Sequence, residues 1–314
     1  MSPHSPLSIV ENEPLSKHTS FGIGGSARWF AHVQSQDQLL EALAFARAHS
    51  LPYYVLGQGS NMIATERGFS GIVLKMEDRV FTIEGRRIES SPGAILSQVA
   101  KAATDEGLSG LEWAYGIPGT IGGAVRGNAG AFGSSMASVV IFAKVIDPET
   151  GIISIMNKDA FEYRYRWSSL ANHRRLIVSV MLELLPSTKE TTRDLLMKYH
   201  ELKKQSQPLG TRCAGSIFKN IPQEDLSTRL IPEELAGRQM VYAGWLIEHA
   251  GLKGVSRGNA QFSEKHANFI VNQGNATYDN VYGLICLAKE RVYDRFAIEL
   301  SEEIRYIGDD RLTY

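Results

Sequence analysis

The sequence contains very little cysteine and no excess of charge of either sign. Its 314 residues include only two cysteines, Cys213 and Cys286, which lie far apart. This excludes a disulfide framework and a CxxC zinc or redox site, and it fits a reducing compartment. The 33 basic residues are balanced by 34 acidic ones, giving a net charge of −1. Such a balance argues against nucleic-acid binding and predicts a small-molecule partner.

Long hydrophobic runs are also missing. The N-terminal residues MSPHSPLSIVENEPLSKHTS have neither the basic segment nor the apolar segment of a signal peptide. No apolar run approaches the roughly 18 residues that a membrane-spanning helix needs. We therefore expect a cytoplasmic protein, a monomer, without membrane contact and without a metal site.

Helix and strand patterns alternate along the chain and divide it into three α+β units, which we place at 1–75, 76–190 and 191–314. Ser35 and Gln38 form a capping-box pattern before a helix over 35–50, whose expected apolar face is Leu39, Leu40, Leu43 and Ala44. Further helices are predicted over 94–107, 193–205, 242–251 and 279–296. Strands are predicted over 51–56, 71–75, 139–147, 176–186, 297–300 and 303–308.

Two glycine-rich segments stand out. LGQGSN (56–61) directly follows a predicted strand, with Gly57 and Gly59 to free the backbone and Ser60 and Asn61 to add side-chain donors. Successive N–H groups in such a loop form an anion-binding nest, although an ordinary turn fits the same residues.

The second segment is GIPGTIGGAVRGNAGAFG (116–133), with seven glycines. It offers another run of amides at Gly119, Thr120, Ile121, Gly122 and Gly123, extended by Asn128. No Lys-Ser/Thr pair follows the glycines, which argues against a P-loop nucleotide triphosphatase. Two nests in neighbouring units fit one long diphosphate ligand held between them.

Four segments, in this order, resemble the UDP-N-acetylenolpyruvoylglucosamine reductase (MurB) family over about residues 12–308. They are LGQGSNMIATERGFSGIVL, GLSGLEWAYGIPGTIGGAVRGNAGAFG, AGSIFKN and EEIRYIG. The resemblance implies that the first two units form a PCMH/VAO-type FAD-binding fold and that the third is a substrate-binding domain. Both glycine loops would then contact FAD. Neither loop contains His or Cys, so we expect non-covalent FAD.

The resemblance also implies an activity: NADPH-dependent reduction of UDP-N-acetylglucosamine enolpyruvate to UDP-N-acetylmuramate in peptidoglycan precursor synthesis. Reduced FAD would give hydride to C3, and Ser216 of AGSIFKN would give a proton to C2. Without the resemblance, a serine that caps a turn is the better interpretation of Ser216. Lys219 and Asn220 of the same motif would bind substrate. Ile221 stands where the family often has proline, and the segment 223–239 is insertion-like.

FEYRYRWSS (161–169) offers two arginines for the substrate carboxylate. The family pattern Tyr-Arg-x-Ser matches Tyr165-Arg166-Trp167-Ser168, so Arg166 is the predicted catalytic cation, with Tyr165 at the substrate and Arg164 in a supporting or structural role. Arginine suits this task because its planar fork grips a carboxylate and stays protonated.

The family's catalytic glutamate matches Glu303 of Glu-Ile-Arg-Tyr-Ile-Gly, and Glu302 falls on the preceding position. A solvated glutamate at a strand end is the alternative. In SEKHANFIVN, His266 could contact substrate, although a lone histidine is more often a structural hydrogen-bonding residue. The short segment from Pro186 to AGSIFKN suggests the short-loop (type II) variant of the family.

Three other functions remain to be distinguished. A flavin oxidase of similar fold would pass electrons to O₂. A serine hydrolase would use Ser216, although AGSIF lacks the G-x-S-x-G elbow. A module that binds a nucleotide without turnover would not need the Arg, Ser and Glu motifs together.

Overall fold

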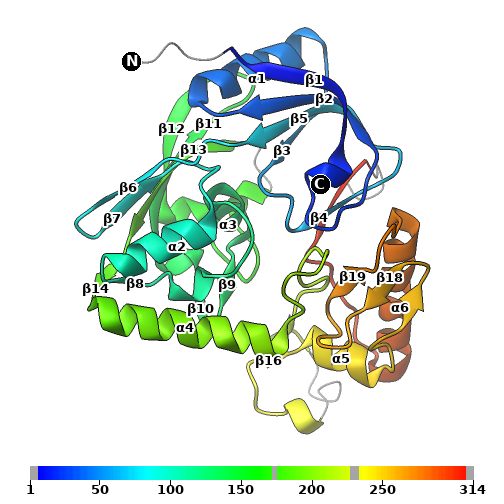
Figure 1. Cartoon of the computed structure of the whole chain (residues 1–314). Helices are drawn as coiled ribbons and strands as arrows, with labels where there is room; N and C mark the ends of the chain where they lie inside the picture. Colours follow the sequence, from blue (N-terminus) through cyan, green and yellow to red (C-terminus); the bar gives the residue numbers. More distant parts are fainter. Residues whose placement is uncertain (1–5, 172–174, 227–232, 309–314) are drawn as a thin grey trace.

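The first of two larger β-sheets is formed by the N-terminal part of the chain, with strand order β1-β2-β5-β3 (Figure 1). The computed structural model describes residues 6–171, 175–226 and 233–308. The strands of this sheet are β1 (Ser8–Pro14), β2 (Ser26–Val33), β3 (Tyr53–Leu56) and β5 (Phe69–Met76). β1 is antiparallel to β2, whereas β2 and β3 both run parallel to β5. β1 was not predicted from the sequence.

The helix α1 (Gln36–Ala48) connects β2 to β3 and covers this sheet. Its N-cap is Ser35, whose hydroxyl accepts the N–H of Gln38 at 3.2 Å, but the Gln38 side chain accepts the N–H of Gln34. The predicted buried face was wrong at Ala44, which is exposed. The sheet instead lies against positions spaced i, i+3, i+4 and i+7, which are Leu39, Ala42, Leu43 and Ala46.

The second sheet is antiparallel throughout, with strand order β12-β11-β13-β7-β6. Its strands are β6 (Phe81–Glu84), β7 (Arg87–Ser90), β11 (Val140–Ile146), β12 (Ile153–Asn157) and β13 (Leu176–Glu183). Two helices, α2 (Leu96–Asp105) and α3 (Ile121–Gly127), pack into its core. The predicted inward residues of α2 are all buried: Leu96, Val99, Ala100 and Ala103.

The long helix α4 (Lys189–Ser206) begins before its predicted start at residue 193 and packs against α2 (Figure 1). Thr188 is its N-cap and accepts the N–H of Thr191 at 3.1 Å. Thr192 is fully buried and donates its hydroxyl hydrogen to the carbonyl oxygen of Thr104 in α2 at 3.0 Å. The boundary predicted after residue 190 therefore falls within the first turn of α4.

The third unit has its own core between α5 (Ala243–His249), α6 (Tyr278–Phe296) and the small sheet β17-β18-β19. The three strands are Ser256–Arg257, Ala260–Phe262 and Ile270–Asn272. The predicted face of α6 is buried, namely Val281, Leu284, Ile285 and Ala288. The predicted strand over 297–300 is wrong, because Ala297 takes a left-handed conformation that ends α6 and the following residues pack into the core without a strand partner.

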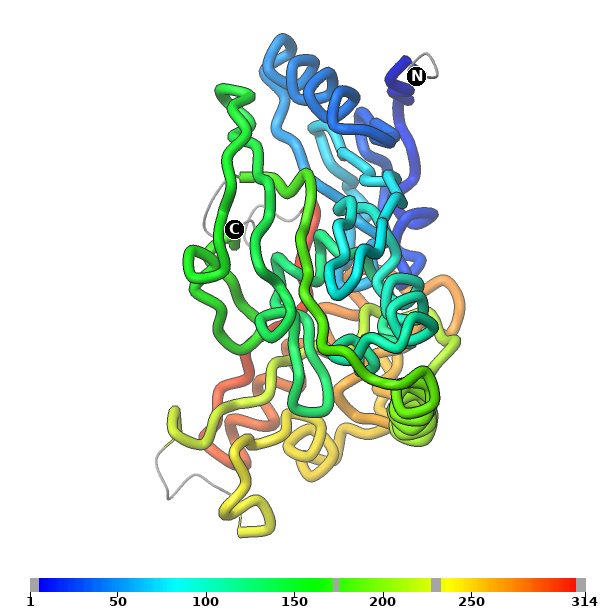
Figure 2. The backbone as a smooth tube through the Cα atoms, turned by 90° about the vertical axis from the view of Figure 1, so that its left-hand side faces the viewer, coloured from blue at the N-terminus to red at the C-terminus, as the bar shows by residue number. Residues whose placement is uncertain are grey.

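The end of the described chain returns to the first unit (Figure 2). β20 (Arg305–Ile307) pairs in parallel with β4 (Met62–Ala64), which follows the first glycine loop. Three further two-stranded pairs complete the fold: β8 (Leu108–Ser109) with β14 (Leu185–Pro186), β9 (Gly130–Ala131) with β10 (Ser134–Ser135), and β15 (Ile221–Pro222) with β16 (Met240–Val241). Of the insertion-like segment 223–239, residues 227–232 lie outside the described residues.

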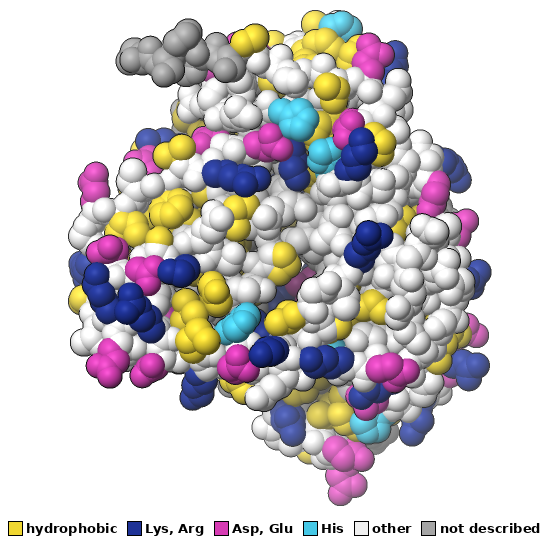
Figure 3. Space-filling view, in the orientation of Figure 1, with side chains coloured by type: hydrophobic (Ala, Val, Ile, Leu, Met, Phe, Trp, Pro, Cys, Tyr) yellow, Lys and Arg dark blue, Asp and Glu magenta, His cyan; other side chains and the backbone are white. Residues whose placement is uncertain are grey.

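The surface agrees with the balanced composition. Acidic and basic side chains are intermixed over the face drawn in Figure 3. Within the described ranges, every helix is too short or too polar to cross a membrane.

Candidate active site

The first glycine loop connects β3 to β4, and its backbone is closely packed. Gly59 has a φ of +65°, and a Cβ there would lie 2.1 Å from the carbonyl oxygen of His18. Gly57 faces the second loop, where a Cβ would lie 2.6 Å from Thr120 Oγ1. Gly59 is therefore required for its conformation and for space, and Gly57 for space alone.

The structure brings the two predicted glycine loops into direct contact. Ser60 Oγ donates to the carbonyl oxygen of Pro118 at 3.0 Å, and the backbone N–H of Gly119 donates to Gln58 Oε1 at 2.5 Å. Gly119 has a φ of +137°, a conformation that side chains rarely adopt. Each loop comes from a different unit, so these hydrogen bonds join the two units at the glycine loops. This arrangement fits the long diphosphate ligand expected from the sequence.

The residues after Gly119 present backbone rather than side chains. Thr120 is buried and caps α3, accepting the N–H of Gly123 at 3.3 Å. Ile121 is fully buried in the core of the second unit. Gly122 lies against Pro92, where a Cβ would be 2.9 Å from the proline Cβ. Any ligand contact from this turn is therefore made mainly through main-chain atoms.

Asn128 connects the glycine-rich stretch to the predicted catalytic arginine. It ends α3 in a left-handed conformation and is buried. Its amide donates to the carbonyl oxygen of Arg164 at 2.9 Å and accepts the N–H of Ala137 at 3.0 Å. The side chain thus positions the segment that leads to Arg166.

Arg166 lies at the tip of a tight hairpin. Arg164 and Trp167 exchange both backbone hydrogen bonds, at 3.0 and 3.1 Å, which leaves Tyr165 and Arg166 between them. Arg166 has a φ of +52°, and strained backbone of this kind persists where the surrounding structure enforces it, often at functional sites. The Arg164 guanidinium lies over the Trp167 ring at 5.0 Å, which fits the supporting role predicted for it.

The two predicted ionic residues of the site are paired. Arg166 Nε lies 2.8 Å from Glu303 Oε1, and the two side chains are 25% and 19% exposed. Burial raises the pKa of the Glu303 carboxyl above its ordinary value, while Arg166 and, more weakly, Lys219 act to lower it. The structure therefore joins the Arg and Glu motifs at one point.

The AGSIFKN segment runs beside Glu303. The backbone N–H of Glu303 donates to the carbonyl oxygen of Ile217 at 2.8 Å, and that of Lys219 donates to Ser301 at the same distance. Ser216, the neighbour of Ile217, is half-buried and pairs through its backbone with Phe269. The segment that carries Ser216 is thereby fixed next to the Arg166–Glu303 pair.

Asn268, a residue that no sequence pattern singled out, holds this segment in place. Its buried side chain accepts the N–H of Phe218 at 2.9 Å and donates to the Phe218 carbonyl at 2.8 Å. His266 in turn accepts the N–H of Asn268 at 3.2 Å and packs edge-on against Phe269. Burial lowers the pKa of His266. These contacts are those of a structural hydrogen-bonding residue, the alternative that the sequence left open.

Tyr165 and Asn220 link the second unit to the third. The Tyr165 hydroxyl accepts the backbone N–H of Asn220 at 3.3 Å, and Asn220 Oδ1 accepts the N–H of Ala243 at 3.1 Å. Burial raises the pKa of Tyr165. This connection fixes the arginine hairpin relative to the third unit.

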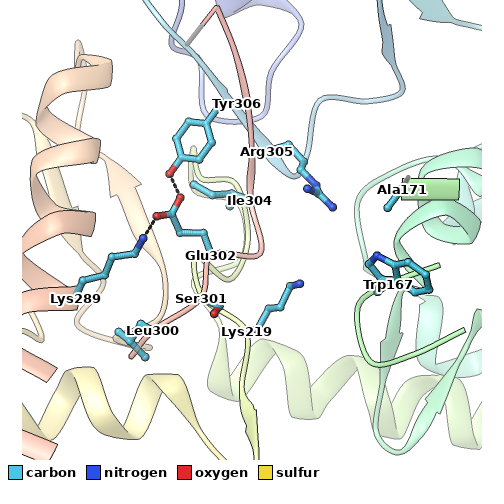
Figure 4. Close-up of a pocket in the computed structure, with 10 residues that line it drawn as sticks. All are labelled: Trp167, Ala171, Lys219, Lys289, Leu300, Ser301, Glu302, Ile304, Arg305 and Tyr306. Atoms are coloured by element: carbon cyan, nitrogen blue, oxygen red, sulfur yellow. Dashed lines mark hydrogen bonds and ion pairs between the residues drawn. The ribbon is translucent and has the colours of Figure 1, made fainter. Parts of the chain in front are cut away.

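A cavity of about 410 Å³ is lined by residues next in sequence to the ion pair, among them Trp167, Glu302 and Ile304 (Figure 4). Lys219 and Arg305 extend toward it from one wall, and Trp167 lies across from them. Burial lowers the pKa of Lys219, and the positive charge of Arg305 lowers it further. Trp167 and Arg305 were not predicted as site residues, although both lie within the quoted motifs. The lining holds the cations Lys219, Lys289 and Arg305 and the carboxylate of Glu302, and this excess of positive charge suits an anionic ligand.

Glu302 points away from Lys219 and Arg305 (Figure 4). Its carboxylate accepts the Tyr306 hydroxyl hydrogen and pairs with the ammonium of Lys289 on α6 (Figure 4). In extended chain, successive side chains point to opposite sides, so only one of two adjacent glutamates can face Arg166. The structure gives that position to Glu303, as the motif indicated.

The site combines two glycine loops from adjoining α+β units with an Arg–Glu pair. Residues 27–156, which contain both loops, match the model of the FAD binding domain, so the chain belongs to the flavoproteins. Residues 207–307 match the model of the C-terminal domain of UDP-N-acetylenolpyruvoylglucosamine reductase. The chain belongs to the UDP-N-acetylenolpyruvoylglucosamine reductase family.

Similar proteins cover nearly the whole chain. A UDP-N-acetylenolpyruvoylglucosamine reductase of Caldanaerobacter subterraneus is 38% identical over 299 residues, covering 95% of this chain and 93% of the relative. One of Clostridium botulinum is 35% identical over 303 residues, covering 96% and 93%. The solved structure of the Thermus caldophilus enzyme has a TM-score of 0.77 at 29% identity, covering 96% of this chain and 99% of that one. The predicted fold class is confirmed.

Proposed function

We propose that this protein is the NADPH-dependent, FAD-containing reductase that converts UDP-N-acetylglucosamine enolpyruvate to UDP-N-acetylmuramate. The observation that supports this best is the Arg166–Glu303 pair, held beside the Ser216 segment, with Asn61 of the first glycine loop donating to the Glu303 carbonyl oxygen and Asn128 of the second stretch donating to that of Arg164. Reduction of the enolpyruvyl double bond places negative charge at C2 and in the carboxylate. The site offers a cation, a hydroxyl proton donor and a carboxyl group for that chemistry.

In this proposal FAD, when bound, supplies the hydride that it has taken from NADPH. Arg166 binds the substrate carboxylate and stabilises the charge that develops there. Ser216 donates its hydroxyl proton to C2, and Glu303 holds Arg166 in position. Lys219, Asn220 and Tyr165 bind the rest of the substrate at the border of the cavity. His266 supports that border through Asn268.

The cofactor site is assigned to the loops 57–61 and 119–123, which would hold FAD without a covalent bond. The missing side chains at Gly57 and Gly119 let the two loops pack directly against each other, since a Cβ at Gly57 would meet Thr120 and one at Gly119 would lie 3.3 Å from Ser60 Oγ. Asn128 would contribute to this site indirectly, because its side-chain amide donates to the carbonyl oxygen of Arg164 in the arginine hairpin.

The organisation proposed with this function has three units, over 1–75, 76–190 and 191–314. Two separate sheets support it, as does the core of the third unit, which takes in only Phe21, Ile23 and Ile63 from the first. The helix α4 packs against α2 of the second unit. We further propose a cytoplasmic monomer of the short-loop (type II) form, supported by the short connection between α4 and the AGSIFKN segment.

Visible spectroscopy of the purified protein tests the function directly. A yellow protein that bleaches with NADPH under anaerobic conditions and recovers colour on adding UDP-N-acetylglucosamine enolpyruvate would bear out donor, cofactor and acceptor together. Recovery in air alone would indicate the oxidase. A colourless protein that binds no added FAD would refute the proposal, and labelling of Ser216 by acylating reagents would indicate the hydrolase.

A further inference from the structure

Lys203 on α4 is a buried lysine for which the reaction has no use. The residue is only 3% exposed, and its ammonium donates to the carbonyl oxygens of Trp113 at 2.5 Å and Tyr115 at 2.6 Å. The ammonium also lies 5.7 Å from the centre of the Phe132 ring. A buried charge is costly unless its hydrogen bonds are satisfied, and two carbonyl oxygens satisfy this one. The presence of a charged residue at this buried position therefore needs an explanation.

The three contacts of Lys203 fall at the two ends of the glycine-rich stretch 116–133. Trp113 and Tyr115 come just before Gly116, and Phe132 comes just before Gly133. The same helix contributes Tyr199, whose ring stacks on Phe132 at 4.4 Å and 6°. His200 packs beside Tyr115 and against Gly116. One face of α4 therefore holds both the entry and the exit of the stretch.

Attachment of α4 to the second unit does not depend on Lys203. The first half of the helix is fixed by the buried Thr192, which donates to the carbonyl oxygen of Thr104, and by the buried Leu196. The contacts of Lys203 lie near the other end, where the helix passes under the hairpin β9–β10 (Figure 1). They restrain the glycine-rich loop rather than the helix.

We propose that Lys203 is a positioning residue for the cofactor site, whose ammonium fastens both ends of the glycine-rich stretch and so preorganises the loop for FAD. Glycine-rich backbone loses much conformational freedom when it orders, and preorganisation raises affinity by removing part of that loss. Charge-assisted hydrogen bonds to carbonyl groups are strong enough to supply the restraint. This inference rests on the FAD site proposed above.

The restraint depends on pH. Burial lowers the pKa of Lys203 to about 8, so the ammonium loses its charge within the range in which the protein can be studied. Within four residues of Lys203, α4 also carries Tyr199 and His200 and the exposed Glu201 and Lys204. The turn packed against this end of α4 carries Glu112 and ends at Tyr115, just before the glycine-rich stretch. On α2, Asp105 pairs with Lys101 and with Arg193 in the first half of α4. Because FAD binding favours the charged form, FAD affinity falls as pH rises through about 8.

The test measures FAD release from the holoenzyme on dilution, by flavin fluorescence, between pH 6.5 and 9.5 (roughly 1.5 units either side of that pKa). In the wild type, FAD affinity decreases several-fold across this range. Lys203→Met binds FAD about tenfold more weakly at pH 7 and loses the pH step. Lys204→Met makes the same chemical change at the next, exposed residue and matches the wild type. His200→Gln keeps the pH step, since the step belongs to Lys203.

Two outcomes overturn the inference while leaving the function intact: FAD binding by Lys203→Met that equals the wild type, or a pH step that survives the substitution. If Lys203→Met does not fold, Phe132→Ala decides. Phe132 is 41% exposed, so its removal spares the fold. It weakens FAD binding if α4 fastens the loop, and unchanged binding contradicts the inference. A wild-type protein that holds no FAD refutes the proposed function itself.

Discussion

Arg166 and Glu303 form an ion pair, with Arg166 Nε 2.8 Å from Glu303 Oε1, between the second unit and the last described segment of the chain. Three constraints produce this contact. The Arg164–Trp167 hairpin aims Arg166, the pairing of β20 with β4 brings Glu303 to the site, and the Ile217 carbonyl accepts the N–H of Glu303. The formation of this ion pair therefore depends on the relative positions of all three units.

Arg166→Lys should lower the turnover number for the enolpyruvyl substrate by about 100-fold, because lysine lacks the planar fork and cannot reproduce its charge placement. Reduction of the flavin by NADPH should persist. Anaerobic stopped-flow absorbance separates the two steps. Arg164→Lys is the matched control and should change turnover by about threefold or less, since Arg164 is exposed. Equal losses in both variants would contradict the assignment of Arg166.

Glu303→Gln should reduce the turnover number by about 100-fold, since the amide cannot pair with Arg166 as the carboxylate does. Its counterpart Glu302→Gln should mainly lower stability, because Glu302 joins Lys289 and Tyr306 instead. Turnover and thermal unfolding of both variants distinguish chemistry from packing. A larger turnover loss in Glu302→Gln would reverse the assignment.

The difference in stability between Glu303→Gln and the wild type should also depend on pH. The pKa of this carboxyl is raised in the fold above its ordinary 4.5, so the folded state binds the proton more tightly than the unfolded state. Wild-type stability from this group therefore falls as pH rises from 4.5 through the folded pKa. The melting temperature of Glu303→Gln minus that of the wild type should increase over this window. A difference that stays flat or decreases over this window would show that burial does not raise the pKa of the Glu303 carboxyl.

Ser216→Ala should slow reoxidation of the reduced flavin by substrate by about 100-fold or more, because the proton donor to C2 is lost. Ser216→Cys keeps an acidic hydrogen and should recover part of the rate. Ser216 pairs through its backbone, so the free energy of unfolding should change by about 0.5 kcal/mol or less. Unchanged reoxidation in Ser216→Ala would remove Ser216 from the mechanism.

Gly57→Ala should weaken FAD binding, because the new Cβ would lie 2.6 Å from Thr120 Oγ1 and force the two glycine loops apart. Thr120→Ala removes the clashing atom, so the double variant should bind FAD better than Gly57→Ala alone. Flavin fluorescence titrations of the single and double variants measure this coupling. Gly127→Ala is the control, because Gly127 lies in the same glycine-rich stretch as Thr120 and a Cβ there would meet no atom of the described residues within 4 Å. This variant should bind FAD normally. Additive effects at Gly57 and Thr120 would contradict the direct contact.

Local sequence predicted the positions of most helices, but it did not predict every buried helix face or every strand. The inward faces of α2 and α6 follow from helical spacing and are confirmed. The face of α1 was misjudged at Ala44, because the position of the covering sheet decides which of two overlapping apolar stripes is buried. The strand expected over 297–300 failed for a related reason: alternating apolar residues also suit an extended segment packed in a core.

The sequence by itself determined the glycine loops, the Arg, Ser and Glu motifs and the family to which the chain belongs, because these depend on residue type and short spacing. Only the tertiary structure decided that Gly57 meets Thr120, that Arg166 faces Glu303 while Glu302 turns to Lys289, and that Lys203 of α4 donates to the carbonyl oxygen of Tyr115 just before Gly116. Most of these contacts join residues more than 60 positions apart. Their formation depends on how whole units pack, and no local pattern encodes that packing.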